Sequence, residues 1–206
     1  ALGKHFIEIK YDQKALIRIV MQSRLYQLSH TPNETNTADT RNFSRMYLRR
    51  LRAEVLMDAI GDVTGVPSSF SATWPGARAV ETWNFKISSE FLDAFGRPNS
   101  SSDPPCERNT SGTIVQALHL MHGDGLQKKI THGKGRARRL ADSKMTLAEI
   151  ADEVYLATLS RRPTQAERAE VKKFFEAIKD NKDARRIAIE DFIWAIINSA
   201  EFIFNH

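Results

Sequence analysis

The sequence has one cysteine, Cys106, among its 206 residues. A single cysteine cannot form a disulfide within the chain, build a multi-cysteine zinc site or attach a haem covalently. No apolar run reaches the ~18 residues that a membrane-spanning helix needs. The sequence therefore excludes a disulfide-stapled fold, a covalent haem and a transmembrane segment within these residues.

Known catalytic spacings are also missing. The chain has no Gly-x-Ser-x-Gly elbow, no phosphate-binding loop of the Walker type and no His-Glu-x-x-His pair. His119 and His122 lie three residues apart with Asp124 nearby, but the spacing sets no third ligand, so we favour a structural role over a metal site. We predict no metal site and assign no catalytic residue.

The lone thiol has charged neighbours, Glu107 and Arg108. A nucleophilic cysteine needs a base and a lowered pKa, and the sequence sets no histidine beside Cys106. A buried thiol next to a Glu–Arg ion pair is the favoured interpretation.

Hydrophobic residues make up 41% of the chain and charged residues 27%, which is typical of a globular protein. The patterns predict a mainly α fold, a single helical domain with a long irregular central segment packed on the helices. We expect helices over 12–63, an irregular segment over 66–111, and helices over 112–206 interrupted by a basic loop at 127–144. The segment from Pro67 holds most of the prolines, which supports the irregular prediction.

Helix signals set the expected boundaries. Asp12 is a candidate N-cap for a well-buried helix that extends to about residue 28. A second helix is expected over 44–63, ending at Gly61 or Gly65. A short helix is expected over 90–95.

The last third of the chain contains two capping boxes. Thr146 with Glu149 and Thr164 with Glu167 each predict the start of a helix. A final helix is expected over 183–204, and its stretch 192–197 is apolar all round, so it should be the most buried element.

The net charge of +5 is concentrated in one segment. Residues 127–144 carry seven basic residues and one acid. The basic side chains are Lys128, Lys129, Lys134, Arg136, Arg138, Arg139 and Lys144. Such a loop is either solvated and mobile or holds an anionic partner such as nucleic acid, lipid head groups or an acidic protein. No aromatic residue lies between these charges, so nucleic-acid binding is disfavoured.

A second group of charged residues lies at the edges of apolar segments. Arginine makes planar, bidentate contacts with carboxylates, which suits it to fasten an irregular segment onto helices. We expect such a clamp to hold the central segment on the helix at 44–63; the alternative is a cleft that binds an anionic ligand. The candidate polar cluster comprises Arg49, Arg50, Glu54, Asp58, Arg97, Cys106, Glu107 and Arg108.

Several strings occur together in order. They include PGARA at 75–79, FGRP at 95–98 and CER at 106–108, with longer matches at 41–60, 116–121, 159–164 and 194–206. The sequence resembles the planctomycete cytochrome-linked C-terminal family, domain-of-unknown-function family 1553. Relatives often have Cys-x-Cys-Glu-Arg where this chain has Pro104, so a paired-cysteine role of Cys106 is not expected.

The resemblance implies a cellular context. Members look like the last module of exported proteins that carry a c-type cytochrome segment and a companion domain, family 1549. It implies that this chain itself holds no cofactor and that haem c is bound by the parent or a partner polypeptide. It also implies a periplasmic or cell-surface location. The expected partners are upstream domains of the same polypeptide or a cytochrome-bearing chain, with polysaccharide as a further candidate. The family has no established reaction.

Three functions remain open from the sequence. The favoured one is a non-catalytic interaction or scaffold module of an exported, cytochrome-c-linked protein, in a setting of surface polysaccharide handling. The alternative is a redox-linked or hydrolytic enzyme domain that acts on a carbohydrate or another anionic substrate. The third is anion or nucleic-acid binding through the basic loop.

Overall fold

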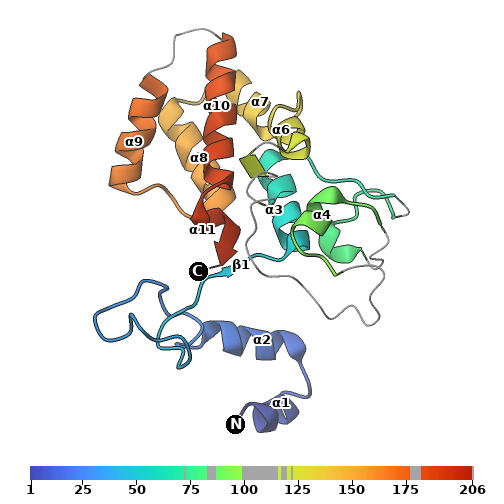
Figure 1. The fold of residues 1–206 in the computed structure, drawn as a ribbon, viewed down its shortest axis with the longest axis vertical. Coiled ribbons are helices and arrows are strands. Elements are labelled where there is room, and N and C mark those ends of the chain that lie inside the picture. The colour runs from blue at the N-terminus through green and yellow to red at the C-terminus, as the bar shows by residue number, and fades with distance from the viewer. Residues whose placement is uncertain are drawn as a thin grey trace. The chain divides into compact units, whose positions relative to one another are not determined.

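A computed structural model of the chain describes residues 1–71, 73–82, 87–98, 116, 120–121, 123–176 and 182–205. Its internal contacts divide the chain into two compact units. The N-terminal unit comprises Ala1–Arg49 and Phe204–His206, and the main unit comprises Arg50–Ile203. The described residues are mostly helical, which confirms the predicted mainly α class (Figure 1).

The N-terminal unit contains two short helices, α1 (Leu2–Glu8) and α2 (Gln13–Gln22). Asp12 caps α2 as predicted, because its side chain accepts a hydrogen bond from the backbone N–H of Ala15 at 3.0 Å. The prediction that this helix reaches residue 28 is wrong. Ser23 is extended, and its hydroxyl donates to the Val20 carbonyl at 2.7 Å and accepts from the Tyr26 N–H at 3.3 Å. These bonds replace the next helical turn.

The predicted helix at 44–63 is wrong over its first part, since α3 spans Ala53–Thr64. Residues before it form the strand β1 (Arg49–Arg50), which pairs with β2 (Phe204–Asn205) in a two-stranded sheet. The next residue, Leu51, donates its N–H to the Ile203 carbonyl at 2.9 Å. Gly65, one of the two ends that the sequence predicted, ends α3 with φ +69°.

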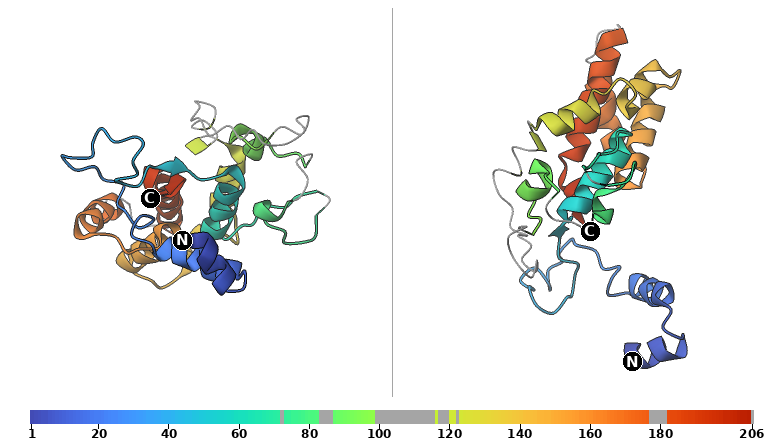
Figure 2. Two further views of the ribbon diagram at one scale, coloured as in Figure 1. Left: turned by 90° about the horizontal axis from the view of Figure 1, so that it is seen from below. Right: turned by 90° about the vertical axis from the view of Figure 1, so that its right-hand side faces the viewer.

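The main unit has its core among α3, α8 (Leu147–Leu159), α9 (Gln165–Glu176) and α10 (Lys182–Ile197). Helix α10 runs alongside α8 in Figure 1 and in the side view of Figure 2, and the two are in contact. Most of the expected apolar stretch 192–197 of α10 is buried, but Trp194 is half-buried and Ala195 is exposed. The largest fully buried side chains are Phe95, Leu56, Leu92, Ile150, Ile189, Ile193, Ile197 and Val154.

Both capping boxes are confirmed. Thr146 accepts from the N–H of Glu149 at 3.3 Å and Glu149 accepts from the N–H of Thr146 at 2.7 Å. Thr164 and Glu167 make the same reciprocal pair at 3.3 and 2.7 Å. These bonds satisfy N–H groups at the starts of α8 and α9, which have no partner within the helix.

The final helix is shorter than predicted. Helix α10 ends at Ile197, and a separate turn, α11 (Ala200–Ile203), follows before β2. The break occurs where the Asn198 side chain donates to the Trp194 carbonyl at 2.8 Å and Ser199 accepts from the Phe202 N–H at 3.3 Å. Side chains that bond the local backbone thus start a new turn.

The predicted basic loop at 127–144 is wrong as a loop. The segment forms most of α6 (Asp124–Ile130) and all of α7 (Arg136–Asp142). The apolar residues of these two helices recur at helical spacing and are buried, namely Leu126, Ile130, Ala137 and Leu140. The charges had masked this spacing in the sequence.

The described parts of the central segment contain the 3₁₀-helix η1 (Ala79–Glu81) and α4 (Glu90–Ala94). The predicted short helix is therefore confirmed, with Ser89 as its N-cap. Residues 99–115 lie outside the described residues, and so do residues 117–119 and 122 in the first part of the predicted helical region 112–206. Within the described parts of the chain, no helix is long and apolar enough to cross a membrane.

Candidate functional site

Asp58 on α3 binds the 3₁₀-helix η1. Its side chain is 8% exposed and accepts from the backbone N–H groups of Ala79 at 2.7 Å and Val80 at 3.1 Å. Arg78 lies 3.5 Å from Asp58 and donates to Asp62 at 2.7 Å, and this hydrogen bond raises the pKa of Arg78. A buried carboxylate with this many donors holds a loop in place.

Arg50 and Arg97 bind the backbone around α4. Arg50 donates to the Phe95 carbonyl at 3.0 Å and lies 5.4 Å from the centre of the Phe95 ring, and burial lowers its pKa. The Arg97 side chain is 4% exposed; it donates to the Ile87 carbonyl and to Asp93, each at 2.6 Å. Both guanidinium groups therefore organise the chain around α4.

The candidate polar cluster is only partly assembled in the described structure. Glu54 and Asp58 are buried one turn apart on α3, with Arg50 just before this helix. Arg49 is exposed and belongs to the N-terminal unit. Cys106, Glu107 and Arg108 lie outside the described residues. An anion site formed by the whole cluster stays a prediction.

Part of the basic segment caps the C-terminal end of α3. Lys129 donates to the Val66 carbonyl at 2.6 Å, and Arg136 donates to the Val63 carbonyl at 2.6 Å. Arg136 also pairs with Glu153 on α8. Burial lowers the pKa of Lys129. Val63 is in the last turn of α3, so Arg136 satisfies a carbonyl that the helix leaves free, and both cations complement the helix dipole.

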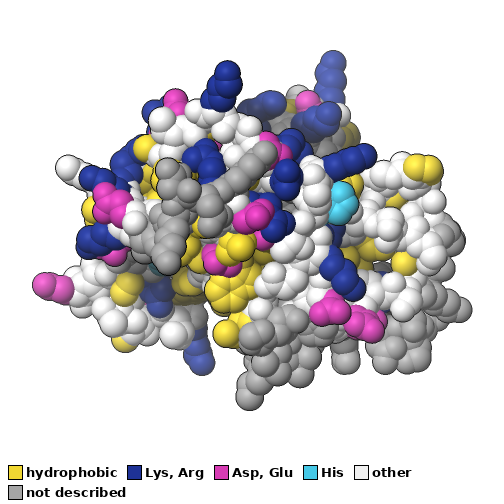
Figure 3. All heavy atoms as spheres, turned by 90° about the horizontal axis from the view of Figure 1, so that it is seen from above, with side chains coloured by type: hydrophobic (Ala, Val, Ile, Leu, Met, Phe, Trp, Pro, Cys, Tyr) yellow, Lys and Arg dark blue, Asp and Glu magenta, His cyan; other side chains and the backbone are white. Residues whose placement is uncertain are grey.

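Other cations of the segment remain near the surface. Arg138 pairs with Asp142 at 2.6 Å, and Lys128 lies 3.6 Å from Asp124. Arg139 donates to the Lys134 carbonyl at 3.3 Å. Seen from above in Figure 3, the protein carries many Lys and Arg side chains with Asp and Glu side chains among them. Such mixed charges are typical of a solvated protein surface.

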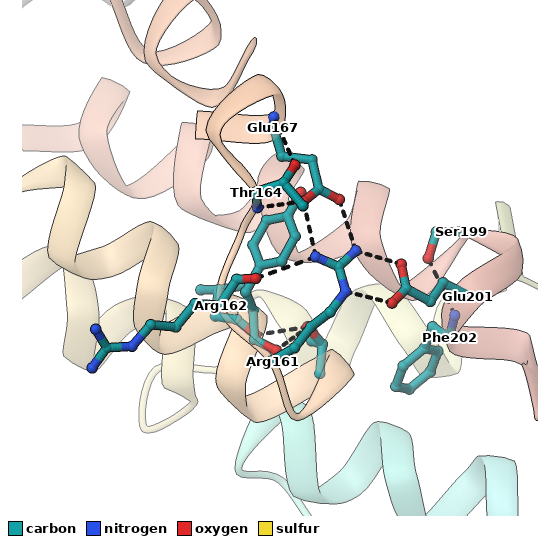
Figure 4. A network of polar contacts seen from close by, with 10 residues as sticks. Arg161, Arg162, Thr164, Glu167, Ser199, Glu201 and Phe202 are labelled. Carbon is teal, nitrogen blue, oxygen red and sulfur yellow. Dashed lines mark hydrogen bonds and ion pairs between the residues drawn. The ribbon is translucent and has the colours of Figure 1, made fainter. Parts of the chain in front are cut away.

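The ionic network around Arg161 was not predicted from the sequence (Figure 4). Arg161, in the turn between α8 and α9, donates to both oxygens of Glu167 at 2.7 and 2.8 Å. It also donates to both oxygens of Glu201 on α11, each at 2.6 Å. Glu167 was identified only as a capping residue. Its pair with Arg161 is local to the turn, whereas the pair of Arg161 with Glu201 depends on α11 lying beside that turn.

This network changes the acidity of its members. The hydrogen bond from Arg161 lowers the pKa of Glu167 from 4.5 to about 2, and the two carboxylates raise the pKa of Arg161. The guanidinium also lies 5.4 Å from the ring centre of Tyr155, whose pKa is raised by burial. Because Arg161 is matched by two carboxylates, the network serves as a structural link between α9 and α11.

The N-terminal unit has a different character. None of the residues 1–49 is buried, although the segment is rich in large apolar side chains. Those that are exposed are Leu2, Ile7, Tyr11, Ile17, Ile19, Val20, Met21, Leu25, Tyr26, Phe43 and Leu48. This contradicts the prediction of a well-buried first helix. Exposed large apolar side chains that lie together are typical of an interaction site.

A cleft of about 310 Å³ lies within this unit. It is lined by Val20, Ser23, Leu25, Tyr26, Phe43, Met46, Tyr47, Arg49 and Asn205. Most of these side chains are apolar or aromatic. Elsewhere, among the residues that the structure describes, no group of three or more His, Cys, Asp or Glu side chains is placed to hold a metal ion.

Comparison with known proteins gives one match. A family model described as PSD1, protein of unknown function (DUF1553), matches residues 1–175. No curated protein and no solved structure matches the chain. The match includes both the exposed N-terminal segment and most of the main unit.

Proposed function

The chain belongs to the DUF1553 family, and we propose that it is a non-catalytic interaction module that docks onto another protein domain through residues 1–49. The partner is an upstream domain of the same exported, cytochrome-c-linked polypeptide, or a separate cytochrome-bearing chain. Haem c belongs to that parent or partner, in the periplasm or at the cell surface. Surface polysaccharide handling is the proposed setting.

One observation carries this proposal: the N-terminal segment exposes eleven large apolar side chains and buries no residue. Burying one such side chain contributes about 1.5–3 kcal/mol. Association costs about 4–15 kcal/mol in lost translational and rotational freedom. A partner that covers half of these side chains therefore offsets that cost.

The main unit supports the proposal by its use of charge. Arg97 and Arg136 bind carboxylates and carbonyls of their own unit, and Arg161 is held by two carboxylates. An enzyme site for an anionic substrate needs cations that face the substrate. These three arginines instead stiffen the body that carries the docking segment.

The test measures binding of the chain to the separately produced upstream domain by isothermal titration calorimetry. Ile17 on α2 is 55% exposed, and Ile187 on α10 is 49% exposed. We expect Ile17→Glu to weaken binding at least 100-fold and the matched control Ile187→Glu to change it less than threefold. If the upstream domain does not bind, or if both variants bind like the unchanged chain, the proposed docking role is overturned.

A further inference from the structure

The cleft of the N-terminal unit has an aromatic wall. Tyr26 and Phe43, each about half exposed, line it together with Tyr47. The rings of Phe43 and Tyr47 are 5.2 Å apart. A volume of about 310 Å³ is at the small end of ligand pockets, so it suits one large side chain rather than a whole helix.

The loop that carries Phe43 is held in a strained conformation. Phe43 has φ +54°, which is uncommon for a residue with a side chain. Asp39 accepts hydrogen bonds from the backbone N–H groups of Arg41, Asn42 and Ser44 and from the Ser44 hydroxyl, and these bonds keep its pKa well below the ordinary value. The Phe43 N–H donates to the Tyr47 hydroxyl at 3.0 Å. The exposed ring is therefore preorganised, which reduces the entropy cost of binding.

Arg49 gives the cleft a positive charge. Its backbone N–H is held by the Asn205 side chain at 3.0 Å. Among the described residues, no carboxylate lies within ion-pair distance of its guanidinium. Asp12 and Asp39, by contrast, are already bound to backbone N–H groups.

The whole N-terminal segment carries an excess of positive charge. Residues 1–49 contain eight Lys and Arg residues and four Asp and Glu residues, a net charge of +4. A second copy of the chain would bring like charges together, so self-association through this face is disfavoured. The complementary surface is apolar at its centre and acidic beside it.

We propose that this cleft binds a segment of the partner protein that presents one large apolar side chain next to an aspartate or glutamate. The apolar side chain fills the space against Phe43 and Tyr47, and the carboxylate pairs with Arg49. The inference rests on the proposed docking function and adds the chemistry of the partner. It makes Arg49 the specificity-determining residue of the surface.

The test uses short probe peptides and the methyl group of Met46, which lines the cleft. One peptide has the sequence acetyl-Ser-Phe-Asp-Ser-amide, and its matched control replaces Asp by Asn. Each peptide is titrated while the NMR resonance of the Met46 methyl group is followed. We expect the Asp peptide to shift this resonance with at least fivefold higher affinity than the Asn peptide. Arg49→Gln should abolish that difference, whereas Arg41→Gln, on the same loop but outside the cleft lining, should not.

Phe43→Gly removes the ring at a position where glycine tolerates the positive φ, so the loop can keep its shape. We expect the Asp peptide no longer to shift the Met46 methyl resonance in this variant, while the midpoint of its unfolding transition stays unchanged. Equal binding of both peptides, no shift with either, or a shift produced only by phosphatidylglycerol vesicles would overturn the inference. If Ile17→Glu abolishes binding of the upstream domain but Phe43→Gly and Arg49→Gln do not, the docking function stands and only this inference fails.

Discussion

Helices α2 and α10 have similarly apolar sequences and opposite surroundings. In α2, Ile17, Val20 and Met21 are exposed, whereas in α10 Ile189 and Ile193 are almost fully buried. Both helices meet the local requirements for helix formation. A dense apolar pattern therefore predicts that a helix packs against another surface. It does not indicate whether that surface belongs to the same unit.

The two units also use arginine differently. Arg161 in the main unit binds two carboxylates of its own unit, while Arg49 in the N-terminal unit faces a cleft. A matched arginine stabilises the fold, and an unmatched one is available for recognition. The two units thus divide stability and recognition between them, and this division can be tested by substitution.

The largest contrast is expected from core truncation. Leu56 is fully buried on α3, so Leu56→Ala should lower the free energy of unfolding by about 2–5 kcal/mol, because it removes packed atoms and leaves a cavity. Ile17→Ala on α2 should cost less than about 0.5 kcal/mol in the isolated chain. Urea unfolding followed by circular dichroism measures both. A loss above about 1 kcal/mol for Ile17→Ala would show that α2 is packed in the free chain.

The next effect concerns the buried carboxylate. Asp58→Ala leaves the N–H groups of Ala79 and Val80 without their acceptor, and it should cost about 2–3 kcal/mol. Hydrogen exchange at these two backbone amides should be faster in Asp58→Ala than in the unchanged chain. Asp62→Ala is the matched control, because Asp62 is exposed and binds the same Arg78; its expected cost is below about 0.5 kcal/mol. Equal costs for both variants would refute the special role of Asp58.

The Arg161 network should give a smaller loss and a pH signature. Arg161→Met leaves Glu167 and Glu201 unpaired and should cost about 1–2 kcal/mol at neutral pH, since all three side chains are about one-third exposed. Exposed Arg162→Met should cost less than about 0.5 kcal/mol.

The pH dependence follows from the lowered pKa of Glu167. Its contribution to stability is fully present above the ordinary pKa of 4.5 and is lost as the pH falls through 4.5 towards about 2. The unchanged chain should therefore lose more stability over this range than Arg161→Met does. Parallel pH profiles in unfolding experiments would contradict the assignment.

The smallest expected effect is a difference in unfolding free energy between substitutions of two adjacent lysines. Lys129→Met removes a donor from the Val66 carbonyl and should cost about 1 kcal/mol. Lys128→Met removes a 3.6 Å pair with Asp124 on the surface and should cost about 0.3 kcal/mol. Thermal unfolding of both variants in parallel measures the difference. A larger loss for Lys128 would show that the basic segment acts through its surface charges.

Much of the fold was predictable where the signal is local. The Thr146–Glu149 box, the cap at Asp12 and the end of α3 at Gly65 all use groups within one turn of each other. The stop of α2 at Ser23 was missed although it is also local, because a serine hydroxyl can either bond the backbone or face solvent.

The charged residues were harder to predict. The basic segment at 127–144 was taken for a loop because its cations hide the spacing of Leu126 and Ile130. The partners of its half-buried cations, Lys129 and Arg136, lie at or just beyond the end of α3, far away in the sequence. Grouping arginines by their neighbours in the chain therefore placed Arg49 with Arg50, although the structure assigns them to different units.

The sequence by itself determined the mainly α class and the starts of α2, α4, α8, α9 and α10, because capping and apolar periodicity act over a few residues. Its ordered strings indicated the family. Only the tertiary structure decided that β1 replaces the first part of a predicted helix, that Arg161 joins α9 to α11, and that α2 stays exposed. Each of these outcomes depends on which distant groups lie within hydrogen-bonding or packing distance. A local pattern carries no information about that distance.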